Sequence, residues 1–87
     1  MRFEFDPTKS VANKAKHGID FLEAQHLWDD EGLVVASARD KDQVRFMAIG
    51  KIDGRHWSAI CTWRGEAIRF ISVRRSRNAE VELYESR

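Results

Sequence analysis

The dipeptide Asp53-Gly54, which separates two strand-like runs, is the feature that most restricts how this chain can fold. The runs Val44–Ile52 and His56–Trp63 flank it on either side. Asp-Gly is favoured in two-residue hairpin turns because both turn positions need a positive φ angle. A two-residue turn also fixes the register, so Ile52 should face Arg55, and Phe46 should face Cys61. We therefore predict an antiparallel hairpin with a defined register.

A second tight turn is indicated by Arg64-Gly65, which precedes the strand-like run Ala67–Arg74. If this loop has an even number of residues, Cys61 faces Ile68, and Ala59 faces Phe70. One sheet face then carries mainly apolar side chains, namely Val44, Phe46, Ala48, Trp57, Ala59, Cys61, Trp63, Ile68 and Phe70. The other face is half polar and carries Arg45, Met47, Lys51, His56, Ser58, Thr62 and Arg69. We expect the first face to pack on two helices and the second to be partly covered by the last helix.

The first of these helices follows a short strand at the start of the chain. Arg2–Phe5 alternates polar and apolar residues, as a half-buried strand does. Asp6 is a suitable N-cap, and Pro7 fits the first helical position, where its missing N–H costs nothing. The helix should run to about His17, because Gly18 supplies the left-handed residue that ends a helix.

The second helix and the remaining elements complete the predicted order. Asp20 and Glu23 have the spacing of a capping box, and Asp29–Gly32 ends the helix. Its buried stripe consists of Phe21, Ala24, Leu27 and Trp28. Leu33–Ala38 reads as a strand, and Ser76 should cap a last helix that extends through Tyr84. The prediction is one α+β domain over residues 1–87, in the order β-α-α-β-β-β-β-α, with a twisted antiparallel sheet.

Composition excludes several classes of protein. A single Cys among 87 residues rules out an internal disulfide framework and a Cys-rich zinc site. His17, His26 and His56 are far apart and have no metal-binding motif around them, so we expect neither a metal nor another cofactor. No signal peptide or transmembrane run is visible, which favours a cytoplasmic protein that does not contact a membrane.

The charge distribution points to a basic surface. Residues 1–43 carry six Lys or Arg and nine Asp or Glu, whereas residues 44–87 carry nine and five. Five bases, Arg45, Arg64, Arg69, Arg74 and Arg75, come from adjoining strands or their ends. Arginine suits phosphate binding because its planar fork donates two hydrogen bonds at once. Ordinary solvated side chains explain any single one of these residues equally well.

Glu80 and Tyr84 lie one turn apart on the predicted last helix and share a face that could rest on this basic region. Metal-free RNA cleavage needs a base for the 2′-hydroxyl, cations for the charged phosphorane and a proton donor for the leaving oxygen. The candidate catalytic residues are therefore Arg64, Arg74, Glu80, Tyr84 and His17, with Glu80 or His17 as the base. The candidate RNA-binding residues are Arg45, Arg69, Arg75, Lys51 and His56. Each also has a structural explanation, such as a helix cap for His17 or packing for Tyr84.

Several landmarks, in order and spacing, resemble the BrnT family of toxins. They are Phe5-Asp6, Asn13 with Lys16-His17-Gly18-Ile19, Phe21 with Ala24, Gly50 with Gly54-Arg55, Thr62–Glu66, Arg69–Arg75, Glu80 and Tyr84. The resemblance implies a RelE-like fold and metal-independent cleavage of cellular RNA, which arrests growth. It also implies a hetero-oligomer with a small DNA-binding antitoxin resembling BrnA, of the ribbon-helix-helix type.

The chain departs from the family pattern at three positions. Gln43 stands where an acidic residue is usual, Val73 where Ala is frequent, and Cys61 where an aromatic is common. Gln43 weakens any mechanism that needs a carboxylate beside Arg45, so it leaves open a binding module or co-repressor that holds nucleic acid without cutting it. A small enzyme acting on a metabolite has little support, because no constellation of carboxylates or His suggests a closed pocket.

Overall fold

The computed structural model describes residues 1–40 and 43–86, and their order of elements is the predicted one. The strands are β1 (Arg2–Glu4), β2 (Val34–Asp40), β3 (Gln43–Ile52), β4 (Arg55–Arg64) and β5 (Ala67–Arg75). The helices are α1 (Pro7–His17), α2 (Phe21–Ala24), the 3-10 helix η1 (Gln25–Asp29) and α3 (Asn78–Glu85). The strands form one sheet in the order β1-β5-β4-β3-β2. The α+β class is thus confirmed.

The first hairpin has the register that its turn predicts. Ile52 pairs with Arg55, and Phe46 pairs with Cys61. Asp53 and Gly54 have φ angles of 51° and 79°, so both turn positions occupy the left-handed region that an Asp-Gly turn requires. All pairs among β2, β3, β4 and β5 are antiparallel, whereas β1 joins the edge of β5 in parallel.

The register predicted for the second hairpin is wrong. The turn lies at Gly65-Glu66, because Arg64 pairs with Ala67, and Cys61 therefore faces Phe70 instead of Ile68. A β-bulge follows: Ile60 pairs with Ser72, so β5 contains one extra residue, Ile71. Ala59 consequently faces Val73 and not Phe70.

The bulge decides which side chains of β5 reach each face. Without an extra residue, strict alternation would put Arg74 on the same face as Phe70, inside the core. With it, Val73 faces Ala59 in the core and is fully buried, while Arg74 faces Ser58 on the opposite, polar face. The β-bulge therefore places Arg74 on the polar face of the sheet.

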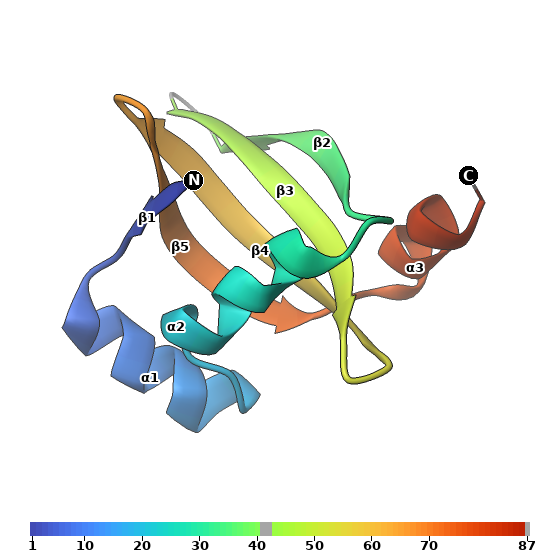
Figure 1. The fold of residues 1–87 in the computed structure, drawn as a ribbon, viewed down its shortest axis with the longest axis horizontal. Helices are drawn as coiled ribbons and strands as arrows, with labels where there is room; N and C mark the ends of the chain where they lie inside the picture. Colours follow the sequence, from blue (N-terminus) through green and yellow to red (C-terminus); the bar gives the residue numbers. More distant parts are fainter. Residues whose placement is uncertain (41–42, 87) are drawn as a thin grey trace.

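The apolar face packs against α1, α2 and η1, as expected, over only part of its length (Figure 1). The core gathers buried side chains from helices and strands, namely Ile19, Phe21, Ala24, Leu27, Ala48, Trp57, Ala59, Cys61, Ile68, Phe70 and Val73. The helices leave one end of the sheet uncovered, where Val44 and Trp63 are 89% and 55% exposed. Their predicted burial is wrong because a short α2 and η1 do not extend over that end.

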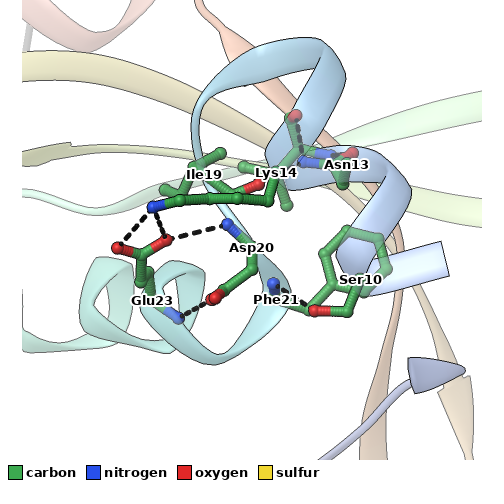
Figure 2. A network of polar contacts seen from close by, with 8 residues as sticks. Ser10, Asn13, Lys14, Ile19, Asp20, Phe21 and Glu23 are labelled. Atoms are coloured by element: carbon green, nitrogen blue, oxygen red, sulfur yellow. Dashed lines mark hydrogen bonds and ion pairs between the residues drawn. The ribbon is translucent and has the colours of Figure 1, made fainter. Parts of the chain in front are cut away.

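A polar network ties α1 to α2 and to β5 (Figure 2). The buried amide of Asn13 donates to the carbonyls of Ile19 and Val73, at 2.8 Å each, and its oxygen accepts from the Val73 N–H. The Ser10 hydroxyl accepts from the Phe21 N–H. The caps predicted for the two helices are present, Asp6 on α1 and the Asp20–Glu23 capping box on α2.

Candidate functional site: a cluster beneath the tail helix

The last helix, α3, brings a carboxylate onto the polar face of the sheet. Its N-cap is Arg77, not the predicted Ser76, whose hydroxyl instead lies 2.7 Å from that of Ser58. Glu80 accepts two hydrogen bonds from the guanidinium of Arg74, at 2.8 and 2.9 Å. The expected contact between this helix and a basic part of the sheet is therefore present.

Glu80 is saturated with hydrogen-bond donors. Besides Arg74, the Ser58 hydroxyl and the Arg77 N–H donate to it. The hydrogen bonds from Arg74 are the main cause that lowers the pKa of Glu80 to about 2, and the donors of Arg77 and Ser58 contribute as well. The same pairing raises the pKa of Arg74. Both groups therefore stay charged, and the guanidinium is held in one orientation.

Tyr84, one turn further along α3, reaches the end of the sheet and is 8% exposed. Its hydroxyl donates to the carboxylate of Asp30, in the segment after η1, at 2.8 Å. The ring of His56 meets the Tyr84 ring edge-on, with centroids 5.2 Å apart. The Lys51 ammonium lies 5.8 Å from the centre of the Tyr84 ring. Tyr84 thus lies close to both His56 and Lys51, which are partners across β3 and β4.

His56 is held by a carboxylate from the end of α3. Its Nε2 lies 2.7 Å from the Glu85 carboxylate, which is also 3.6 Å from the Lys51 ammonium. The hydrogen bond with His56, more than the nearby Lys51 charge, lowers the pKa of Glu85. A charged Glu85 fixes the ring and favours the tautomer with the proton on Nε2, which leaves Nδ1 as the nitrogen that accepts a proton.

Five of the candidate residues therefore lie together, two from the predicted RNA-binding set and three from the predicted catalytic set. We call them the tail cluster: Lys51, His56, Arg74, Glu80 and Tyr84. An open cleft of about 490 Å³ adjoins the cluster at Lys51 and Tyr84. The rest of its lining includes His26, Asp29, Asp30 and Asp53, so carboxylates outnumber the single lysine there.

Arg64 and Arg69 lie in a different part of the sheet. Both approach Glu4 of β1, at 3.7 Å from Arg64 and 3.2 Å from Arg69. Arg64 ends β4, eight residues after His56, which corresponds to about 26 Å along an extended strand. Arg64 is therefore far from the tail cluster, although the sequence analysis names Arg64 and Arg74 as members of one candidate catalytic set.

The other three candidates are also outside the tail cluster. Arg45, paired with Ala38, lies near the end of β3 that is remote from Lys51. Arg75 pairs with Trp57 on the helix-bearing face and stacks over its ring at 5.5 Å. His17 is the last residue of α1, on that same side of the sheet. The Gln43 side chain lies outside the described part of the structure.

Sequence reasoning missed four partners of the tail cluster: Asp30, Ser58, Ser76 and Glu85. Asp30 belongs to the acidic run that was interpreted only as a helix end, and Ser76 was interpreted only as a cap. Glu85 follows Tyr84 directly, but its contact with His56 depends on how α3 docks. Only Ser58 carried a signal, since strand alternation had already placed it on the polar face.

The remaining groups with chemical potential are buried or isolated. Cys61 is fully buried, and burial raises the pKa of its thiol to about 12, which suits a core residue better than a nucleophile. Among the described residues, no three His, Cys, Asp or Glu side chains gather as a metal site would require. No helix in the described ranges is long and apolar enough to cross a membrane.

Comparison with known proteins identifies the family of the chain. A search of curated proteins found no match. A family model described as the ribonuclease toxin BrnT of type II toxin–antitoxin systems matches residues 5–80. This range contains nearly all of the fold and four members of the tail cluster, and it ends at Glu80, the third residue of α3, before Tyr84. The chain belongs to the BrnT family of ribonuclease toxins of type II toxin–antitoxin systems.

Proposed function

We propose that this chain is an endoribonuclease that cleaves cellular RNA in the cytoplasm without a metal ion, and so arrests growth. The observation that carries the proposal is the convergence of His56 and Lys51 on Tyr84, beside an open cleft. His56 supplies an imidazole that can accept a proton at Nδ1, and Lys51 supplies a positive charge next to it. The family supports ribonuclease activity in general, and the cluster supplies a chemical route for it.

In the proposed reaction, Nδ1 of His56 accepts the proton of a 2′-hydroxyl, and the 2′-oxygen attacks the adjacent phosphorus. The bond from phosphorus to the 5′-oxygen breaks, and the Lys51 ammonium gives that oxygen a proton. The products are a 2′,3′-cyclic phosphate and a 5′-hydroxyl. Lys51 and Arg74 stabilise the negative charge that develops on the phosphorus oxygens.

Glu80 and Glu85 act as positioning residues in this scheme. A carboxylate with a pKa of about 2 is a poor general base at neutral pH, so we assign Glu80 to hold Arg74. Ser58 links the Arg74–Glu80 pair to His56. It donates a hydrogen bond to Glu80, and it lies two residues from His56 on the same face of β4, about 7 Å along the strand. Glu85 holds His56 in the required tautomer.

The proposal is tested with purified protein and cellular RNA in the presence of EDTA. We expect RNA fragments that end in 2′,3′-cyclic phosphates and carry 5′-hydroxyls, and loss of these fragments in His56→Ala. Lys9→Ala is the control, since this exposed basic residue lies on α1, outside the tail cluster. Intact RNA with the wild-type protein, or cleavage that requires an added divalent cation, would contradict the proposal.

A second candidate function is RNA binding without cleavage, which Gln43 leaves open because it stands where an acidic residue is usual in the family. Such a module would hold RNA in a strongly salt-dependent way and leave it intact. The EDTA experiment separates the two functions, because only the ribonuclease generates new ends.

The family implies an antitoxin partner for this chain. We propose that the partner resembles BrnA, that it carries a ribbon-helix-helix DNA-binding domain and that the two proteins form a hetero-oligomer. Co-expression with the product of the neighbouring reading frame tests this proposal. The expected result is a stable complex that is not toxic, and a neighbour without a ribbon-helix-helix pattern would contradict the class of partner.

A further inference from the structure

A second basic region lies on the polar face of the sheet, at the end away from α3. Cys61 is buried in the core and pairs with Phe46 on β3 and Phe70 on β5, so the neighbours of these residues point to the opposite face. We call these neighbours the distal row: Arg45, Thr62 and Arg69. The row crosses three adjacent strands, so the Cα atoms of Arg45 and Arg69 lie about 10 Å apart. Figure 1 shows that the β4–β5 turn and β1 mark this end of the sheet.

The arginines at this end keep a net positive charge despite their ion pairs. Arg69 donates to the Glu4 carboxylate at 3.2 Å, and Arg64, at the end of β4, lies 3.7 Å from the same carboxylate. One carboxylate thus stands opposite two guanidiniums. The side chains of Arg64 and Arg69 are 61% and 27% exposed, so a ligand can reach both from solvent. A guanidinium has five N–H donors, so Arg69 can hold Glu4 and a second anionic group at once.

The distal row shares the polar face with the tail cluster. His56, Ser58 and Thr62 alternate along this face of β4, so the distal row lies about 20 Å from His56 and about 13 Å from Ser58 along the strand. Ser58 in turn pairs with Arg74 of the tail cluster. The row between them consists of three half-buried, uncharged residues, Met47, Ile60 and Ser72. Basic side chains on both sides of an uncharged strip suit a polyanion that extends across the sheet, because its charges repeat along the chain.

We propose that the distal row is a phosphate-binding subsite for the RNA strand that flanks the scissile phosphate, a few nucleotides away from it. The RNA crosses the middle row with its sugars and bases and places a further phosphate against Arg45 and Arg69. Contacts of this kind position the strand and carry no base preference. The inference rests on the proposed action on RNA, and it holds equally for cleavage and for binding without cleavage.

An acidic segment of a protein partner is the other polyanion that this surface could meet. The structure favours RNA, because the distal row lies on the same face of the same strands as His56 and Arg74, the groups proposed to act on a phosphodiester. A strand of RNA held at His56 and extended along β4 meets the distal row without leaving the sheet. Affinity should therefore rise once the RNA is long enough to span the middle row.

The test measures binding to 2′-O-methyl RNA, which lacks the free 2′-hydroxyl and cannot be cleaved by the proposed route. Fluorescence anisotropy compares a dinucleotide, too short to span the two regions, with a hexanucleotide. The wild type should bind the hexanucleotide about tenfold more tightly, and Arg45→Gln combined with Arg69→Gln should remove most of that gain. Lys9→Gln is the control, because Lys9 is an exposed base on α1, on the other side of the sheet, and this variant should keep the gain. Thermal melting checks that all variants are folded.

Two further readouts separate a phosphate contact from a loss of structure. Each phosphate contact with a single strand contributes about 0.7 to the slope of log Kd against log salt concentration, so the double variant should reduce the slope for the hexanucleotide by about 1.4. Glu4→Gln removes the carboxylate that holds Arg69, and it should lower the Kd for the hexanucleotide about twofold or more. A misfolded protein would not bind more tightly, so this result has a sign that unfolding cannot produce.

The outcomes that overturn the inference are distinct from those that overturn the ribonuclease proposal. The inference fails if the hexanucleotide Kd is the same in wild type and double variant, or if Glu4→Gln leaves it equal or higher. Loss of binding to the protein of the neighbouring reading frame, with RNA binding unchanged, would assign the distal row to an acidic protein segment instead. Intact RNA in the EDTA experiment, together with length-dependent binding that the double variant loses, would remove the ribonuclease proposal and leave this inference standing.

Discussion

The Tyr84 hydroxyl donates a 2.8 Å hydrogen bond to the carboxylate of Asp30, and this contact joins the tail helix to the segment after η1. Asp30 also accepts from the backbone N–H of Lys51 and of Gly32. One carboxylate therefore connects three parts of the chain at the edge of the cleft. The position of Tyr84 relative to His56 and Lys51 depends on it.

This relationship predicts energetic coupling between the two residues. Tyr84→Phe and Asp30→Asn should each lower the free energy of unfolding by about 1–2 kcal/mol, since each weakens a partly buried hydrogen bond. The double variant should lose less than the sum, with a coupling energy of about 0.5–1.5 kcal/mol. Urea denaturation of the four proteins measures it. Strictly additive losses would show that the bond contributes nothing.

The lowered pKa of Glu80 predicts that the free energy of unfolding depends on pH. Its pKa in the folded protein, about 2, lies below its ordinary value of 4.5. The stabilisation is therefore complete above about pH 4.5 and is lost as the pH falls towards 2, and its size is of the order of 2–3 kcal/mol.

Denaturation of wild type and Glu80→Gln at several pH values tests this prediction. We expect the wild type to be more stable at pH 7 and the difference to shrink steadily below about pH 4.5. Glu82→Gln is the control, because Glu82 is exposed on the same helix. A difference between wild type and Glu80→Gln that stays constant down to pH 2.5 would argue against a charged Glu80 as its source.

We predict that a side chain added at Gly50 overpacks the region near Asp30. A Cβ atom at this position would lie 3.0 Å from Leu27 Cδ2 and 3.1 Å from Leu33 Cδ1. Gly50→Ala should therefore cost about 1–3 kcal/mol of stability through overpacking. Leu33→Val in the same chain should recover part of that loss, and thermal melting of the single and double variants compares them. A double variant as unstable as the sum of its parts would show that Leu33 does not contribute to the clash.

We predict that the Cys61 thiol does not react in the folded protein. It is fully buried, and burial raises its pKa to about 12, so little thiolate is present or accessible at neutral pH. Alkylation by iodoacetamide should be slower by about a hundredfold or more in native buffer than in denaturant. Equal rates in both conditions would place the thiol at the surface.

The sequence predicted the elements and the first hairpin because their signals are local. Asp6, Asp20, Gly18 and the Asp53-Gly54 turn each act within a few residues, and the structure confirms their roles. The register predicted for the second hairpin was wrong because a bulge has no local signature in β5. The predicted burial of Trp63 was wrong because helix length, and not strand alternation, decides which end of the apolar face is covered.

The candidate site was only partly accessible to sequence reasoning. The α3 spacing placed Glu80 and Tyr84 on one face, and alternation placed Lys51 and His56 on the polar face. The charge pattern could not separate Arg74 from Arg64, because both are bases near strand ends. Only the bulge and the docking of α3 show that Arg74 meets Glu80, whereas Arg64 lies near Glu4.

The central claim is that His56 accepts the proton in RNA cleavage, and single-turnover kinetics with excess protein in EDTA tests it most directly. We predict that His56→Gln lowers the cleavage rate constant by about a hundredfold or more, the range expected of a general base, while the Kd for RNA and the rate of the Lys9→Ala control stay near wild type. A His56→Gln rate constant equal to that of the wild type would contradict the account.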